Sequence, residues 1–147
     1  MFKYRKSNGS LVVEAAISVM VFSLASVFVV NAHIENCNII KRRILNENVM
    51  RNIENLKCEI KYNLNNNDID NLFQNEKIGF KYDDDFGKQF LVKKINEFEI
   101  GNDIVIEVMD RNEEKIEFKV NAHIHQDNIR VDIIDEFNKS WWMYEEI

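Results

Sequence analysis

Residues 11–30 read LVVEAAISVMVFSLASVFVV, twenty positions with a single ionisable side chain, that of Glu14. A helix of this length rises about 30 Å, which matches the hydrocarbon core of a bilayer. Neither Pro nor Gly interrupts the stretch. The segment from Leu11 to Val30 therefore predicts a transmembrane helix.

The charges of the chain differ on the two sides of this apolar segment. Lys3, Arg5 and Lys6 precede it without any acid, whereas residues 31–147 contain 16 bases and 24 acids, a net charge of about −8. Basic residues beside a span stay on the cytoplasmic side. The sequence thus predicts a single-pass cell-membrane protein with a cytoplasmic N-terminus and an extracytoplasmic C-terminal head.

Length and composition exclude several classes of protein. A chain of 147 residues provides one folded domain and an appendage. Its net charge of −6 has the wrong sign for a general nucleic-acid binder, so we expect no nucleic acid among its partners. The apolar segment predicts membrane lipid as a partner. Hydrophobic residues at 46% support a packed core, and the absence of Pro with only four Gly excludes collagen-like chains and glycine-loop nucleotide sites.

Three kinds of N-terminus fit these features: a secretory signal peptide, a plain membrane anchor, and a leader followed by a helix that also drives assembly. A signal-peptidase site can be drawn after Ala32, but the apolar segment exceeds the usual length of about 7 to 15 residues and contains a carboxylate. A plain anchor explains length and orientation. It leaves Glu14 to snorkel towards the headgroups from about 4.5 Å beyond Leu11.

The residues around Glu14 form an ordered pattern, in which KSNG at residues 6–9 is followed by SLVVEAAI at residues 10–17. This segment resembles the N-terminus of type IV pilin-like proteins and is most similar to Tad-type pseudopilins. The resemblance implies leader cleavage between Gly9 and Ser10, N-methylation of Ser10, and a role for Glu14, the fifth residue of the mature chain, in subunit register. Unlike many members, the mature chain would start with Ser instead of Phe and has no Pro kink in its helix.

The resemblance also implies how such a chain acts. Burying a lone carboxylate is costly, and pairing Glu14 with the new amino terminus at Ser10 of a neighbour offsets that cost. The implied partners are a prepilin peptidase, other pilin-like subunits and an inner-membrane assembly platform. We expect a structural minor pilin-like or pseudopilin subunit of a type IV pilus, a Tad pilus or a type II secretion or competence pseudopilus. The alternative is a bitopic membrane protein whose extracytoplasmic domain binds a ligand or partner.

Beyond the apolar segment, apolar residues recur at steps of three or four residues, which predicts a helix from about Ser10 to about Tyr62. Its second half would pack one stripe against a core. The stripe comprises Ile44, Leu45, Val49, Ile53, Leu56, Ile60 and Leu64. The Asn-rich residues 63–67 end the helix, because Asn favours caps and turns.

After Glu76, apolar and polar residues alternate, which predicts strands at 77–82, 103–109, 115–125 and 128–134. Turn residues between them favour an antiparallel meander. In the third strand, Ile116, Phe118, Val120, Ala122 and Ile124 share one dry face. The predicted fold class is α+β, a long N-terminal helix packed on a small antiparallel β-sheet, as in pilins.

These patterns divide the chain into four predicted segments. Residues 1–9 form the basic cytoplasmic leader, and residues 10–30 the transmembrane and assembly half of the helix. Residues 31–64 form the amphipathic half, and residues 65–147 the β-rich extracytoplasmic head.

Few residues of the head indicate chemistry. His123 and His125 share a strand face and can supply two metal ligands, and residues 83–85, three Asp in a row, can offer oxygens to Ca²⁺. A solvated strand face and a solvated turn account for both, so we expect no metal and no cofactor. Cys37 and Cys58 would lie about 31 Å apart on one helix, which predicts free, partly buried thiols.

The C-terminal cluster of Trp141, Trp142 and Tyr144 fits core packing, a subunit interface or a lipid contact. Acidic neighbours disfavour anionic lipid, so the functional prediction for this cluster is a subunit interface. The sequence shows no nucleophile with an ordered base partner and no phosphate loop, and we expect no enzyme activity.

Overall fold

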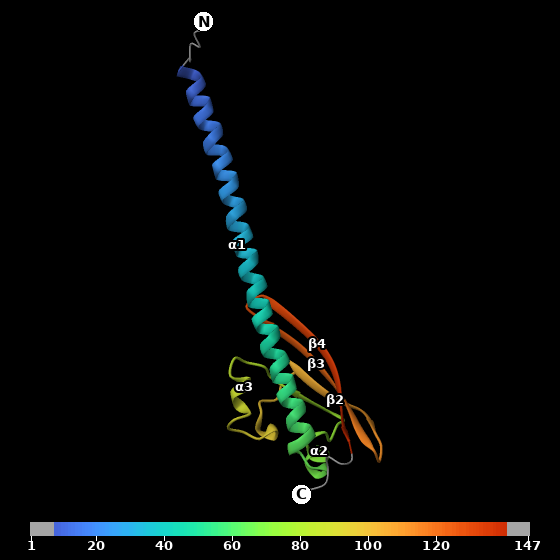
Figure 1. Cartoon of the computed structure of the whole chain (residues 1–147). Helices are drawn as coiled ribbons and strands as arrows, with labels where there is room; N and C mark the ends of the chain where they lie inside the picture. The colour runs from blue at the N-terminus through green and yellow to red at the C-terminus, as the bar shows by residue number, and fades with distance from the viewer. Residues whose placement is uncertain (1–7, 141–147) are drawn as a thin grey trace. The chain divides into compact units, whose positions relative to one another are not determined.

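The structure is a computed structural model of the chain, in which residues 8–140 are described, with side chains from Leu11 onward (Figure 1). The chain forms two compact units, whose border lies between Lys41 and Arg42. One helix, α1 (Asn8–Cys58), begins in the first unit and ends in the second. A π-helical turn, η1 (Glu59–Asn63), continues it without a break. The prediction of one helix to about Tyr62 is confirmed.

The second unit has the predicted α+β fold, and its sheet is a four-stranded antiparallel meander in which chain order and sheet order coincide. The strands are β1 (Lys77–Phe80), β2 (Ile104–Arg111), β3 (Lys115–Gln126) and β4 (Ile129–Ser140). Strands β3 and β4 pair along their whole length. The register of β2 and β3 shifts between Val108 and Asp110, so Met109 lies in a bulge.

Three short helical segments complete this unit: α2 (Asn66–Leu72), α3 (Phe86–Gln89) and η2 (Ile95–Glu97). The side chain of Asn65 accepts a 2.8 Å hydrogen bond from the amide of Asp68, whose carboxylate accepts one from the amide of Asn65 at 3.4 Å. This capping box starts α2. The Asn-rich stretch therefore ends one helix and begins the next.

The core lies where the end of α1 crosses one face of the sheet (Figure 1). From the helix it receives Val49, Ile53, Leu56 and Ile60, all fully buried. Ile44 was expected in this stripe and is instead 53% exposed. The reason is geometric, because a step of one residue from Leu45 turns the side chain about 100° around the helix.

The predicted dry face of β3 is confirmed. Ile116, Phe118, Val120, Ala122 and Ile124 are all buried. The ring of Phe118 lies between those of Phe73 and Phe137, at centroid distances of 5.3 Å and 4.9 Å. The sheet thus turns one apolar face to α1 and keeps a polar face outside.

Strand β4 runs to Ser140, six residues beyond the predicted end at Ile134. Its inward positions include two charged side chains, those of Asp135 and Lys139. Lys139 is fully buried, and its Nζ donates to the carbonyl oxygen of Ile60 at 2.9 Å and also to that of Leu64. Ile60 lies in the last helical turn and Leu64 is its C-cap, and at a helix end unpaired acceptors and the negative end of the helix dipole favour a cation.

A second lysine joins the helix to the same strand. Lys57 Nζ contacts Glu54 Oε1 at 2.8 Å and the carboxylate of Asp135. Burial opposes the charge of Lys57, but the hydrogen bonds to Asp135 and Glu54 dominate and raise its pKa. Burial also opposes the charge of Asp135, and the hydrogen bond from Lys57 still lowers its pKa. For Lys139, burial lowers the pKa.

Helix α3 escaped the sequence prediction. It is anchored by Phe86, which is fully buried and whose ring lies 5.5–5.7 Å from those of Tyr82, Phe90 and Phe98. The chain approaches α1 closely here, since a Cβ on Gly87 would lie 2.8 Å from the Asn52 side-chain oxygen. Close packing therefore holds α3 against α1.

Candidate functional site

In the first unit, the apolar surface predicted from the sequence is fully exposed. Each residue from Leu11 to Val30 is exposed, and the apolar part of α1 has no share buried against protein. The helix is long and apolar enough to cross a membrane. By length and composition, it suits a membrane anchor or a signal sequence.

The hydroxyl groups of this segment are satisfied within the helix. Ser18, Ser23 and Ser26 each donate a 2.8 Å hydrogen bond to the carbonyl oxygen four residues earlier. In hydrocarbon, a polar group without a hydrogen-bond partner costs on the order of several kcal/mol, because its desolvation is not compensated. The back-bonded serines therefore make the whole surface compatible with lipid or with another apolar helix.

Glu14 is the exception on this surface. It is exposed, and residues 11–30 contain no other ionisable side chain, so an opposite charge has to come from outside the segment. Ser10 and Glu14 are four positions apart, which places them on one side of α1. The Gly9–Ser10 bond lies in the first turn of α1, where the backbone amides lack helical partners and the turn opens most easily.

The other predicted functional residues lie where the structure describes the backbone alone, or lie outside the described residues. For Gly9 and Ser10 the structure describes only the helical backbone, so cleavage and methylation stay predictions. Trp141, Trp142 and Tyr144 fall outside the described residues, and their role at a subunit interface also stays a prediction.

One member of the histidine pair, His123, forms polar contacts on the surface of the sheet. His123 Nδ1 lies 2.8 Å from Asp132 Oδ1 in the opposite position of β4, and Arg130 Nε contacts the same carboxylate at 2.7 Å. The hydrogen bonds from His123 and Arg130 lower the pKa of Asp132. Within residues 8–140, no group of three or more His, Cys, Asp or Glu side chains is placed to hold a metal ion.

The three consecutive Asp residues form local turn contacts. Asp83 Oδ1 accepts from the amide of Asp85 at 3.0 Å, and Asp85 pairs with Lys88 Nζ at 2.5 Å. Asp84 accepts from the Gln126 side chain at 2.5 Å, beside a cavity of about 220 Å³. These bonds are those of a solvated turn, with each carboxylate bonded within the protein.

The cysteines are free, as predicted, but both are exposed and not partly buried. Cys37 Sγ lies 3.7 Å from His33 Nε2 one turn earlier, and Cys58 ends α1. The correction follows from helix geometry, because Cys58 is two positions beyond the buried Leu56 and so lies about 200° around the helix from it.

One surface feature of the head was missed by sequence reasoning. A cavity of about 380 Å³ opens on β2, β3 and β4 beside the β2–β3 turn. It is lined by Met109, Glu117, Phe118, Glu136, Phe137 and Asn138. Met109, which lies in the bulge, is one of its lining residues, and a bulge leaves little trace in an alternating sequence.

No family model matches this chain, and the comparisons with curated proteins and with solved structures give no match either. The architecture itself is pilin-like: a long N-terminal apolar helix is followed by a four-stranded antiparallel sheet. Architecture alone defines no specific function.

Proposed function

We propose that this chain is a structural subunit of a pilin-like filament, a minor pilin-like or pseudopilin protein that is inserted in the membrane before assembly. The machine would be a type IV pilus, a Tad pilus or a type II secretion or competence pseudopilus. Its head lies outside the membrane and its N-terminus in the cytoplasm. Its partners are a prepilin peptidase, other pilin-like subunits, an inner-membrane assembly platform and membrane lipid, and it catalyses no reaction.

One observation carries this proposal: a fully exposed apolar helical surface that bears a single carboxylate, Glu14, at its N-terminal end. A surface of this size is stable only in lipid or against other apolar helices. Anchoring alone needs no carboxylate, and a charge in the span costs roughly 2.5 to 3.5 kcal/mol at the centre and less towards the edge. Assembly gives the carboxylate a use.

The use follows from the spacing of Ser10 and Glu14. Cleavage after Gly9 creates a positive amine one helical turn from Glu14. When a second helix packs alongside with a stagger of about one turn, its amine comes within reach of this carboxylate. An ion pair in a low-dielectric helix bundle fixes the axial register, since any other stagger leaves both charges unpaired.

The first experiment tests the Gly9–Ser10 bond. The full chain is produced in a host with a prepilin peptidase, and its intact mass and N-terminal sequence are measured after recovery from membranes. We expect a chain that starts at Ser10, with or without a methyl group on its amine. A chain starting at Met1 would make it a plain anchored ectodomain, and a start at His33 a secreted protein.

The second experiment tests the carboxylate. Glu14→Ala and Glu14→Gln should leave membrane insertion and cleavage intact and abolish incorporation into filaments, because the register pair is lost. Ser18→Ala, one turn further on the same exposed surface, is the matched control and should assemble normally. Normal incorporation of both Glu14 variants would refute the register role.

A further inference from the structure

The segment after α3 presents two apolar side chains to solvent. Leu91 is 86% exposed and Val92 is 82% exposed, the highest values among the large apolar side chains of residues 11–140. Their backbone is nevertheless bonded, because the amides of Leu91 and Val92 donate to the carbonyls of Lys88 and Gln89 at 3.1 Å. The fold therefore holds these side chains outside.

The same segment is basic in an acidic protein. Residues 86–94 contain Lys88, Lys93 and Lys94 and no acid. Lys88 pairs with Asp85, while Lys93 and Lys94 are exposed on the C-terminal side of Val92. We call residues 88–94 the basic loop. It combines an apolar tip with a positive flank.

The cavity beside the β2–β3 turn has the opposite character. Its lining contains two carboxylates, Glu117 and Glu136, while Lys61 Nζ lies 5.6 Å from the ring centroid of Phe137, which also lines it. Residues 107–119, which carry the turn, contain five acids and three bases. Glu117 already contacts Lys115, and Met109 adds an exposed apolar side chain at the cavity edge. The lysines of the basic loop are opposite in charge to the two carboxylates of this site. Its apolar lining residues are Met109, Phe118 and Phe137.

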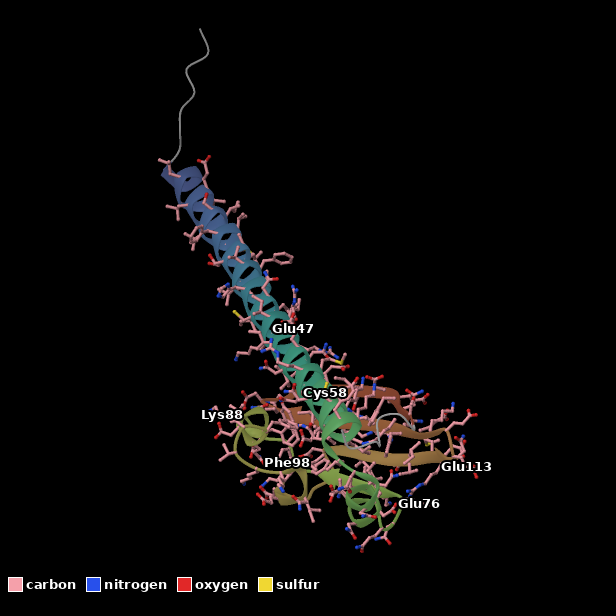
Figure 2. The ribbon with its side chains drawn as sticks, turned by 60° about the horizontal axis from the view of Figure 1, so that its bottom comes forward. Glu47, Cys58, Glu76, Lys88, Phe98 and Glu113 are labelled. Carbon is pink, nitrogen blue, oxygen red and sulfur yellow. The ribbon has the colours of Figure 1, made fainter. Side chains whose placement is uncertain are left out.

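The two surfaces are on one head but far apart. Figure 2 shows Lys88, from the basic loop, and Glu113, from the β2–β3 turn, at opposite ends of the head. The loop therefore cannot fill the cavity of its own chain. A second copy brings an identical loop and leaves its own cavity open, so each contact creates a site for the next.

We propose that the basic loop of one copy docks into the cavity between β2, β3 and β4 of the next copy. Leu91 and Val92 enter beside Met109, and Lys93 and Lys94 face Glu117 and Glu136. The contact is heterologous and propagates along a row of copies. It rests on the proposed function, in which membrane-inserted copies are brought into a filament.

A disulfide test measures the contact in the full chain. In a Cys37→Ser/Cys58→Ser background, a copy with Leu91→Cys is co-expressed with a differently tagged copy carrying Met109→Cys, and membranes are mildly oxidised. The control replaces Leu91→Cys by Tyr62→Cys. Tyr62 is also exposed but lies on η1, outside the basic loop. We expect a mixed disulfide dimer in roughly tenfold higher yield than in the control, a ratio set by proximity.

Charge reversal tests the chemistry of the contact. Lys93→Glu/Lys94→Glu in the loop copy, or Glu117→Lys/Glu136→Lys in the cavity copy, should each reduce the mixed dimer at least about fivefold, because two rim attractions become repulsions. Both reversals together should restore the yield, which damage to either fold cannot do. Lys41→Glu/Lys77→Glu, with the same change in net charge as the loop reversal, should leave the yield unchanged.

The outcomes separate this contact from the proposed function. A mixed dimer at control level in filaments whose subunits start at Ser10 overturns the contact and leaves the filament role standing. A specific, rescuable dimer from chains that start at Met1 keeps the contact and overturns the filament role. Binding of the chain to phosphatidylglycerol vesicles that depends on Lys93 and Lys94, without a specific dimer, would make the loop a lipid contact and overturn the proposal.

Discussion

The two halves of α1 use similar apolar residues for opposite purposes. From Val49 to Ile60, apolar side chains return every three or four positions, and all that face the sheet are buried. From Leu11 to Val30, they surround the helix and all are exposed. The first pattern specifies a partner within the chain, and the second specifies an apolar environment outside it. One half of the helix thus suits the packed core of the head, and the other half suits lipid or other apolar helices.

The strongest way to break this comparison is a matched pair of truncations. Leu56→Ala removes a fully buried side chain and should lower the free energy of unfolding of the head by about 2–5 kcal/mol, whereas Leu24→Ala should change it by less than about 0.5 kcal/mol. Urea titration of the full chain in detergent, followed by circular dichroism, measures both. Equal effects would show that residues 11–30 pack on protein.

The second prediction concerns the buried lysine that joins β4 to the helix end. Lys139→Met keeps the length of the side chain and removes the donors to the carbonyls of Ile60 and Leu64. Leaving buried acceptors unpaired should destabilise the head by about 1–3 kcal/mol in the same titration. Lys77→Met, at an exposed position of β1, is the control. A stabilised Lys139 variant would mean that burying the charge costs more than its hydrogen bonds contribute.

The smallest expected effect is a pH dependence from the pair between Lys57 and Asp135. The folded-state pKa of Asp135 lies below its ordinary value of 3.8, so the stability it contributes is present above that value and is lost as pH falls through the lowered pKa. The loss should be within about 1 kcal/mol for this partly exposed pair. Urea midpoints measured between pH 5 and pH 2 should fall less steeply in Asp135→Asn. An identical slope would contradict the assignment.

Much of this fold could be predicted because its periodicities are regular. The stripe from Val49 to Ile60 and the alternation in β3 both survive as buried faces. The predicted end of β4 was wrong for a physical reason: Asp135 and Lys139 occupy inward positions, and their charges interrupt the alternation. Their partners come from α1 and η1, about eighty residues earlier, which no local pattern reveals.

The candidate sites were predictable to different degrees. The exposed apolar surface with Glu14 follows from composition alone, since residues 11–30 are apolar on every side of the helix and all are exposed. Helix α3 was missed because Asp-Asp-Asp-Phe-Gly at residues 83–87 is typical of a turn, and tertiary packing of Phe86 decides its structure. The cavity is lined by residues of three strands, including Met109 of the bulge, so no single segment of the sequence predicts it.

Under the proposed function, in which the head is exported, the contact of Lys139 with the end of the helix also sets an order of events during export. The acceptors Ile60 and Leu64 precede it by 79 and 75 positions. A chain threaded through a translocation channel from its N-terminal side delivers the helix end long before the strand that completes it. Until residue 139 emerges, the last helical carbonyls stay open to water and β3 has an unpaired edge. The head would therefore acquire its final stability late, when β4 has left the channel.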